Sequence, residues 1–583
     1  MTLEPDWNGE YDRGNSHEEV PEISTELVAG TFVGRQAEQA RFRQMLLELA
    51  GPRKGFFRGL LGPSSRKSKA PKTWPIKSRV VLITGPAGSG KTRLAFRLRE
   101  IVQKEKEFVQ RFRTIRLDWA ELFERDTRLT ARLAGEPLSP EILLDLLHNH
   151  CLRENGEPYF EAYRAALDET KTLAKTEQGA ELQAVWEYRA RALGKSLKEW
   201  SYERPLFFFL ENISFIKLAF QTIIIPILEE SGSQVFFILS GETVSTDLNG
   251  QIQPERLAIF QPEPFTPDEI RAFLEIELLR YKSSRKLNAV AEEVPLLSPG
   301  LVEQLEEITG GLPLACRMAA FLLQTGLSIE DLKVTSAETL PLLAEQLMTG
   351  PLGAGHPDRL KLYALTVLRR PEPGLLSALF DLRKDMLEID ETLERFNQRY
   401  TFLFEPGRAM TLHAALLPAF RRWLAHPDHR DESAGLVKVN QHGLEYLDTR
   451  LQEWGANFSS LSARLSDLKW RDWALDKIWH SFWISEDLGW PVALALLVAG
   501  LGLRPTFARQ VTALLEKVAQ EGLLDERGHQ RLGHFRETVL MPLKNCRPIL
   551  REFRMMGQEG SFFAKGLPQS APELSKIIEE LLN

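Results

Sequence analysis

The 583-residue chain is poor in cysteine, and its three cysteines, Cys151, Cys316 and Cys546, lie far apart. No two of them form a CxxC pair or fall at zinc-ligand spacing, which argues against a disulfide-stapled fold and against a zinc module. The thiols are therefore expected to be small buried hydrophobic side chains of a protein in the reducing cytoplasm.

The chain also lacks a hydrophobic run long enough to cross a membrane. Its most apolar run, 492–503, is shorter than the ~20 residues that a bilayer span needs, so we expect a buried helix there. Residues 1–28 have no apolar stretch and are rich in acidic residues against the lone Arg13, which is typical of a disordered tail and not of a signal peptide. A short docking peptide is the alternative for this tail. We expect a cytoplasmic protein with no membrane contact.

An excess of positive charge is confined to one stretch. The net charge of −7 gives no general attraction to nucleic acid, but 53–79 contains many lysines and arginines and no acidic residue. Such a stretch is either a solvated loop or a contact for the phosphates of nucleic acid.

From Val80 onward the hydrophobic pattern is typical of alternating strands and helices. Continuous apolar runs predict strands buried on both faces of a parallel sheet, at 80–84, 114–117, 206–210 and 235–239. Helices are expected at 36–49, 93–104 and 215–230, and the charged segment 119–203 predicts a mostly helical insertion. This alternation indicates a doubly wound α/β domain.

A glycine-rich loop joins the first strand to the next helix, with the sequence Gly85-Pro86-Ala87-Gly88-Ser89-Gly90-Lys91-Thr92. Its glycines allow positive φ angles and a close backbone approach, so successive N–H groups at a helix start can surround an anion. The Lys91 ammonium then faces the β- and γ-phosphates, and the Thr92 hydroxyl is suited to Mg²⁺. We expect a P-loop here that binds ATP or ADP, with Arg93 beside it.

An acidic residue after another buried strand is needed to orient Mg²⁺ in such a site. The candidate is Glu211, which follows the strand 206–210 directly, so Thr92 and Glu211 are the predicted metal ligands. Asn212 comes next, where a second acid would activate water, and an amide can orient water but cannot take its proton. Lys91, Glu211 and Asn212 are thus the candidate catalytic residues, and slow hydrolysis is expected. The alternative for Glu211 is an acid at a helix N-terminus.

Helices replace strands after about residue 262. Thr266 is a predicted N-cap, followed by Pro267 at the first helical position and acidic residues in the first turn. Three short helices and a hairpin over 358–424, with a Pro406-Gly407 turn, form the pattern of a winged helix. The rest of the chain is expected to be helical and shows no clean 34-residue repeat.

The predicted organisation is therefore an acidic tail at 1–28 and a P-loop nucleotide-binding domain at 29–262, with its insertion at about 119–203. A helical lid at 263–347, a winged-helix domain at 348–430 and an all-α C-terminal domain at 431–583 follow it.

These motifs in this order resemble the STAND class of signal-transduction NTPases, which contains the NB-ARC and NACHT switches. Phe32-Val33-Gly34-Arg35 is similar to the short motif that edges the adenine, and 206–212 is similar to the Walker B strand. The segment 310–315, Gly-Gly-Leu-Pro-Leu-Ala, resembles the lid motif whose proline, here Pro313, packs on the base. His413 lies where the family's winged helix places a histidine that senses the β-phosphate of ADP. The resemblance covers roughly 29–425.

The resemblance implies an ATP/ADP-controlled switch. Its C-terminal helices would sense a trigger, and the ATP form would self-assemble or recruit an effector partner. Two features depart from the family: strand 235–239 ends in Ser240-Gly241-Glu242, without the arginine that reads the γ-phosphate, and Glu211 replaces the usual aspartate. The competing hypotheses are a DNA-associated AAA+-like ATPase that uses the 53–79 stretch, and a scaffold that keeps its nucleotide for structure.

Overall fold

The computed structural model describes most of the chain between residues 32 and 540. The described residues are 32–50, 79–118, 140–153, 156–173, 180–211, 213, 220–241, 252, 256–284, 299–332, 339–381, 386–404, 410–426, 429 and 434–540. The predicted acidic tail and almost all of the basic 53–79 stretch lie outside them, as do Cys546, Asn212 and the predicted Pro406-Gly407 turn.

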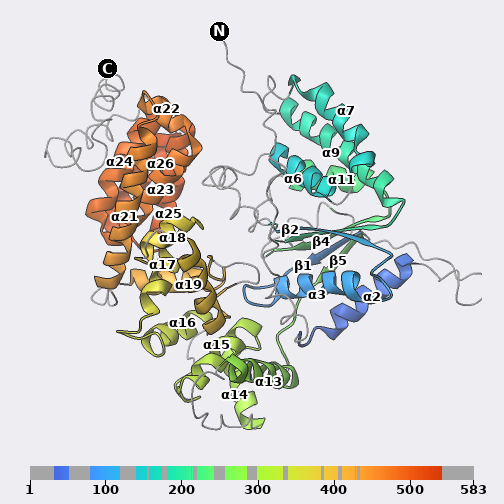
Figure 1. Cartoon of the computed structure of the whole chain (residues 1–583), viewed down its shortest axis with the longest axis horizontal. Helices are drawn as coiled ribbons and strands as arrows, with labels where there is room; N and C mark the ends of the chain where they lie inside the picture. Colours follow the sequence, from blue (N-terminus) through green and yellow to red (C-terminus); the bar gives the residue numbers. More distant parts are fainter. Residues whose placement is uncertain are drawn as a thin grey trace, which may run out of the picture.

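A five-stranded parallel sheet forms the core of the first part of the chain (Figure 1). The four predicted strands are confirmed, and a fifth that the sequence pattern did not indicate lies beside the first. The strands are β1 (Val80–Ile83), β2 (Arg113–Asp118), β3 (Leu206–Glu211), β4 (Val235–Ser240) and β5 (Leu257–Phe260). Their order across the sheet is β2-β3-β4-β1-β5, so β4 separates β1 from β3.

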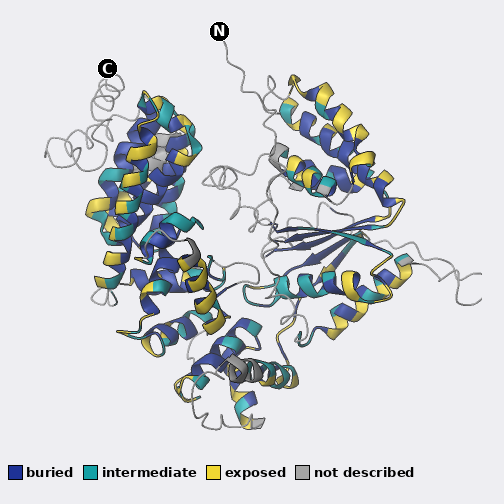
Figure 2. Cartoon of the chain, viewed as in Figure 1, coloured by how far each residue is buried: buried dark blue, intermediate teal, exposed yellow. Residues whose placement is uncertain are grey.

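Helices cover both faces of this sheet, as the alternating pattern predicts. Helices α2 (Gln36–Ala50) and α3 (Lys91–Lys104) lie on one face, where alternate strand residues such as Val81 and Phe209 are buried with them. The insertion covers the other face, with α6 (Pro140–Arg153), η1 (Glu157–Tyr159), α7 (Glu161–Thr170) and α9 (Ala180–Ser201), together with η3 (Phe220–Ile224) and α11 (Ile225–Glu230). Burial on both sides explains why β3 and β4 are apolar up to their last residue (Figure 2).

The helical segment after the sheet begins where its capping residues indicate. Helix α13 (Pro267–Ser284) has Thr266 before it, and the Thr266 N–H donates to the Glu269 carboxylate at 2.9 Å. The Glu269 N–H in turn donates to the Thr266 hydroxyl at 3.4 Å, so the two residues form a reciprocal capping box. Three helices follow, α14 (Pro299–Thr309), α15 (Pro313–Gln324) and α16 (Thr339–Thr349).

The predicted winged-helix segment contains helices and a short antiparallel pairing. The helices are α17 (Arg359–Val367), α18 (Pro373–Leu379), α19 (Met386–Arg399) and α20 (Leu417–Ala425). Between α19 and α20, Phe404 and Leu412 form an isolated antiparallel bridge. We refer to residues 402–404 and 410–414 as the hairpin segment.

The C-terminal part is entirely helical over the residues that the structure describes. Its helices are α21 (Ala434–Gly455), α22 (Leu461–Ser466), α23 (Leu468–Ile484), α24 (Glu486–Leu503), α25 (Pro505–Gln520) and α26 (Glu526–Leu540). By length and composition alone α24 could cross a membrane, but 61% of it is buried, because it packs between α23 and α25. The apolar run at 492–503 is therefore the buried helix that its length predicts.

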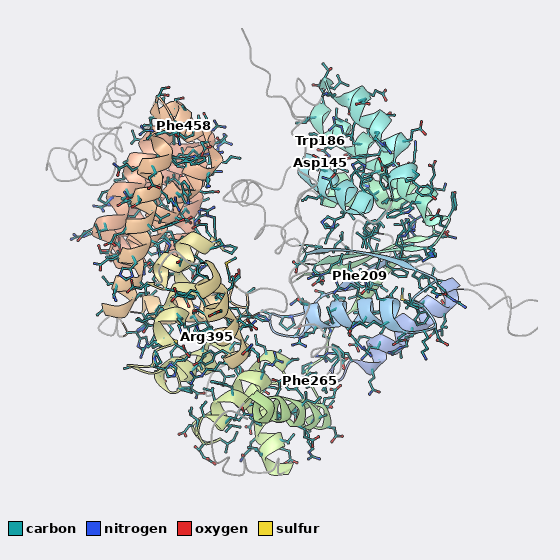
Figure 3. The ribbon with its side chains drawn as sticks, in the orientation of Figure 1. Asp145, Trp186, Phe209, Phe265, Arg395 and Phe458 are labelled. Atoms are coloured by element: carbon teal, nitrogen blue, oxygen red, sulfur yellow. The ribbon has the colours of Figure 1, made fainter. Side chains whose placement is uncertain are left out.

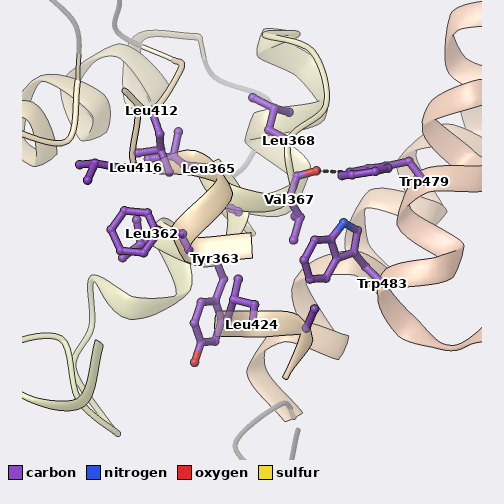
Figure 4. Packing of buried hydrophobic residues seen from close by; sticks show 14 of the residues in the cluster. Leu362, Tyr363, Leu365, Val367, Leu368, Leu412, Leu416, Leu424, Trp479 and Trp483 are labelled. Carbon is purple, nitrogen blue, oxygen red and sulfur yellow. Dashed lines mark hydrogen bonds between the residues drawn. The ribbon is translucent and has the colours of Figure 1, made fainter. Parts of the chain in front are cut away.

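Helix α23 joins the C-terminal helices to α17 through buried polar contacts. The Trp479 indole donates to the Val367 carbonyl at 2.6 Å, at the C-terminal end of α17 (Figure 4). Asp476, which is fully buried, accepts from Arg369 at 2.6 Å and from Arg370 at 2.9 Å. Arg370 also donates to Asp472, one turn earlier on α23, at 2.9 Å. These buried ion pairs hold α23 against the C-terminal end of α17.

One turn further along α23, the fully buried His480 makes folding sensitive to acid. Its Nδ1 lies 2.7 Å from the Asn440 amide oxygen on α21. Burial lowers the pKa of His480 to about 4; Asp476 opposes this shift and Arg369 adds to it. A histidine with a lowered pKa binds its proton more weakly in the folded state, so its contribution to stability is complete above about pH 6.5 and falls as the pH drops towards 4.

We therefore expect acidification to destabilise the wild type more than a His480→Gln variant. Between pH 6.5 and pH 5 the difference should be about 2 kcal/mol in the free energy of unfolding. Urea titrations at the two pH values measure it. Burial raises the pKa of the neighbouring Asp472 to about 6, which acts in the opposite direction, but both proteins share it. Equal pH dependence in the two proteins would contradict the prediction.

Candidate functional site

The glycine-rich loop lies at the carboxyl end of β1 and leads directly into α3. Gly88 and Gly90 have φ angles of 80° and 89°, in the left-handed region that favours glycine. The Leu94 N–H donates to the Gly90 carbonyl at 2.9 Å, which closes the first turn of α3. The loop therefore surrounds a helix N-terminus, where backbone N–H groups and the helix dipole favour an anion.

The side chain of Lys91 lies over this loop. Its ammonium donates to the carbonyls of Gly85 and Pro86, each at 2.9 Å. The positive charge is thus already placed at the loop, on the first residue of α3. Thr92 follows it on the same helix turn, and both residues line a pocket.

The start of α15 is joined to the loop by a backbone contact. The Leu314 N–H donates to the Gly88 carbonyl at 3.4 Å, and Pro313 is the first residue of α15. Gly311 precedes it with a φ of 66°, and an added Cβ would lie 2.6 Å from the Phe265 carbonyl oxygen. Only glycine allows this close approach to the segment before α13, while the Leu314–Gly88 contact joins α15 to the loop.

Arg35 connects the N-terminal motif to the same loop. Its guanidinium donates to the Ser89 carbonyl at 3.2 Å and to the Glu263 carbonyl, and it lies 5.0 Å from the centre of the Phe265 ring. Figure 3 shows Phe265 at the connection between the sheet and α13. Burial lowers the pKa of Arg35, and the nearby carboxylates of Glu38, Glu269 and Glu263 oppose that shift. The arginine therefore has a structural role at the edge of the loop.

The hairpin segment brings His413 to this region. The His413 N–H donates to the Leu403 carbonyl at 2.6 Å, and its ring Nδ1 accepts from the Ala415 N–H at 3.1 Å. Phe402 packs on Phe321 of α15, with ring centres 5.0 Å apart. The hairpin segment is thus held against α15, the helix that touches the loop.

One pocket is lined by all of these segments. The predicted site residues that line this pocket are Val33, Arg35, Gly88, Ser89, Gly90, Lys91, Thr92, Arg93, Pro313 and His413. Gly34, Gly85, Pro86 and Ala87 are not among the lining residues, although the Gly85 and Pro86 carbonyls accept from the lining residue Lys91. Segments that are far apart in the sequence therefore meet around one space next to Lys91.

Comparison with models of known protein families and with curated proteins gave no match.

The pocket also contains residues that the sequence pattern did not indicate. Arg317 of α15 donates to Glu277 of α13 at 2.7 Å, and both line the pocket beside Phe273. Arg317 lies four residues after Pro313 and therefore on the same helix face. That spacing is visible in the sequence, but it places Arg317 at the pocket only because the start of α15 contacts the glycine-rich loop.

Glu211 lies at the end of β3, as predicted, but it does not line the pocket. It is 3% exposed, and one of its oxygens, Oε1, accepts from Arg116 at 2.9 Å. Burial raises the pKa of Glu211, while the Arg116 guanidinium opposes the shift. Because β4 lies between β1 and β3, Glu211 is not on the strand next to the loop.

The structure therefore does not bring the two predicted Mg²⁺ ligands together around the pocket. Thr92 lines the pocket and Glu211 does not, since its carboxylate is engaged by Arg116. Among the residues that the structure describes, no group of three or more His, Cys, Asp or Glu side chains is placed to hold a metal.

Proposed function

We propose that the chain is a nucleotide-controlled switch of the STAND class that binds ATP or ADP in this pocket. The glycine-rich loop acts as a P-loop, in which Lys91 and the backbone N–H groups at the start of α3 bind the phosphates. Val33 and Pro313 edge the base, and His413 contacts the phosphates of the resting, ADP-bound state. Hydrolysis is slow, because Glu211 is engaged by Arg116.

One observation carries this proposal: the loop, the N-terminal motif, the start of α15 and the hairpin segment line a single pocket. A nucleotide in that pocket would touch the sheet, the lid helices and the winged-helix segment at once. It would stabilise the arrangement in which these parts are close together. ADP and ATP act as a switch only if they bind the closed and open arrangements with different affinities.

The switch would act on other molecules when this closed arrangement opens. A trigger sensed by the C-terminal helices would draw the hairpin segment from the pocket, allow exchange of ADP for ATP, and expose a surface for self-assembly or for an effector partner. The buried contacts between α23 and the end of α17 support this route, because they join the C-terminal helices to the predicted winged-helix segment, to which His413 also belongs.

Replacing His413 by alanine should favour the released state. We expect ADP to bind about tenfold more weakly, since the loss of a phosphate hydrogen bond costs about 1–1.5 kcal/mol, and the ATP analogue to change less. Calorimetric titrations with ADP and with a non-hydrolysable ATP analogue measure the ratio. Light scattering should then detect larger species of the variant with the ATP analogue.

His442→Ala is the matched control. This histidine lies on α21, is partly buried and does not line the pocket. It should leave both affinities and the size distribution unchanged. If His413→Ala kept the wild-type ratio of ADP to ATP-analogue affinity, and every nucleotide gave the same size distribution, the switch would be ruled out.

A further inference from the structure

Arg116 and Glu211 lie diagonally across two neighbouring strands. Strands β2 and β3 are parallel, with Arg116 opposite Phe209 and Asp118 opposite Glu211. Residues two apart on a strand point to the same face, so Arg116, Asp118 and Glu211 share one face of the sheet. Arg116 donates to Glu211 at 2.9 Å and to Asp118 at 3.2 Å, and one guanidinium therefore joins the two carboxylates.

The two carboxylates are buried, but the arginine that joins them reaches solvent. The side chains of Glu211 and Asp118 are 3% and 5% exposed, whereas that of Arg116 is 30% exposed. The second oxygen of Glu211, Oε2, is buried and has no hydrogen-bond partner among the described residues. A buried carboxylate oxygen without a partner is destabilising, so this carboxylate is only half satisfied in its present position.

The nucleotide pocket is lined at this edge of the sheet by other residues. Strand β4 contributes Ser240, and Gly241 follows it; Thr92 lines the pocket from α3. Glu211 does not reach the pocket and faces Arg116 instead. While its Oε1 accepts from Arg116, this carboxylate stays outside the lining of the pocket.

We propose that Arg116 is a positioning residue that holds Glu211 away from the nucleotide pocket, so that nucleotide binds in this arrangement without a metal ion at Glu211. The inference rests on the proposed function. Magnesium adds little to nucleotide affinity while the Arg116–Glu211 pair is intact. Breaking the pair frees the Glu211 carboxylate, one oxygen of which already lacks a hydrogen-bond partner among the described residues. The affinity for nucleotide then depends on magnesium.

The test is the affinity for ADP measured with excess Mg²⁺ and with a chelator. In the wild type the two dissociation constants should agree within about twofold. In Arg116→Gln the affinity with Mg²⁺ should exceed that with chelator by about tenfold, the scale of one charge-assisted contact. In the double variant Arg116→Gln/Glu211→Gln the two constants should agree again.

Arg113→Gln is the matched control, because Arg113 lies on the same strand but pairs with Glu203, at 3.5 Å. It should behave as the wild type. A wild type with strong magnesium dependence that Glu211→Gln abolishes would overturn the proposal, and this comparison holds even if Arg116→Gln fails to fold. An Arg116→Gln variant that folds and stays independent of magnesium would also overturn it, leaving a purely structural ion pair. Absence of ADP binding by the wild type would instead refute the proposed function, and the inference with it.

Discussion

Lys91→Ala should weaken ADP and ATP-analogue binding by about 100-fold or more. The Lys91 ammonium already lies over the loop, 2.9 Å from the carbonyls of Gly85 and Pro86. A charge-assisted hydrogen bond contributes about 1.5–3 kcal/mol, and about 2.8 kcal/mol corresponds to a hundredfold change in the dissociation constant. Isothermal titration of the variant and the wild type with each nucleotide measures the loss.

Lys104→Ala is the control for this experiment. Lys104 is the last residue of the same helix, and its ammonium pairs with Glu100 at 3.0 Å, away from the pocket. We expect wild-type affinity. If Lys91→Ala bound nucleotide as tightly as Lys104→Ala, the glycine-rich loop would not be the phosphate site, and the proposed switch would have to be abandoned.

Asp476→Ala should lower the stability of the C-terminal helices by about 3–5 kcal/mol. Burial opposes ionisation of Asp476, but the Arg369 and Arg370 guanidiniums outweigh it and hold its pKa below the ordinary value. Removing the carboxylate leaves two guanidiniums, 8% and 7% exposed, without this partner. Urea unfolding followed by tryptophan fluorescence measures the change, because Trp470, Trp473, Trp479, Trp483 and Trp490 are all in these helices.

Lys438→Ala is its matched control. Lys438 on α21 pairs with Asp381, which follows α18, so it links the same two parts of the chain, but both side chains are more than half exposed. An exposed pair of this kind contributes little, at most about 1 kcal/mol. Unfolding midpoints that moved equally in the two variants would show that the buried charges do not hold α23 to α17.

Arg421 provides a further connection between the predicted winged-helix segment and the C-terminal helices. Arg421 of α20 donates to the Thr366 carbonyl at 3.0 Å and to Glu521 of α25 at 2.9 Å. Helix α20 follows the hairpin segment directly. The helix that follows the hairpin segment is thus attached both to α17 and to α25, so we expect movement of the C-terminal helices to be passed on to His413.

Local features were readable from the sequence because their causes are local. The strand 80–83 is a run of apolar residues, the helix start at Thr266 depends on residues within one turn, and the glycine-rich loop depends on backbone freedom at Gly88 and Gly90. Strand β5 was missed because its pattern is short and half exposed, and it is a strand only because it pairs with β1. The buried Cys151 and Cys316 agree with the expectation for cysteine.

The sequence by itself determined where a phosphate-binding loop could form, since strand, glycines, lysine and helix start are consecutive residues. It also determined the alternation that gives a parallel sheet with helices on both faces. Only the tertiary structure decided that Pro313 and His413 lie beside that loop, and that Glu211 faces Arg116 and not the pocket. The physical reason is that these outcomes depend on strand order and on hydrogen bonds between distant residues, which no local pattern of side chains specifies.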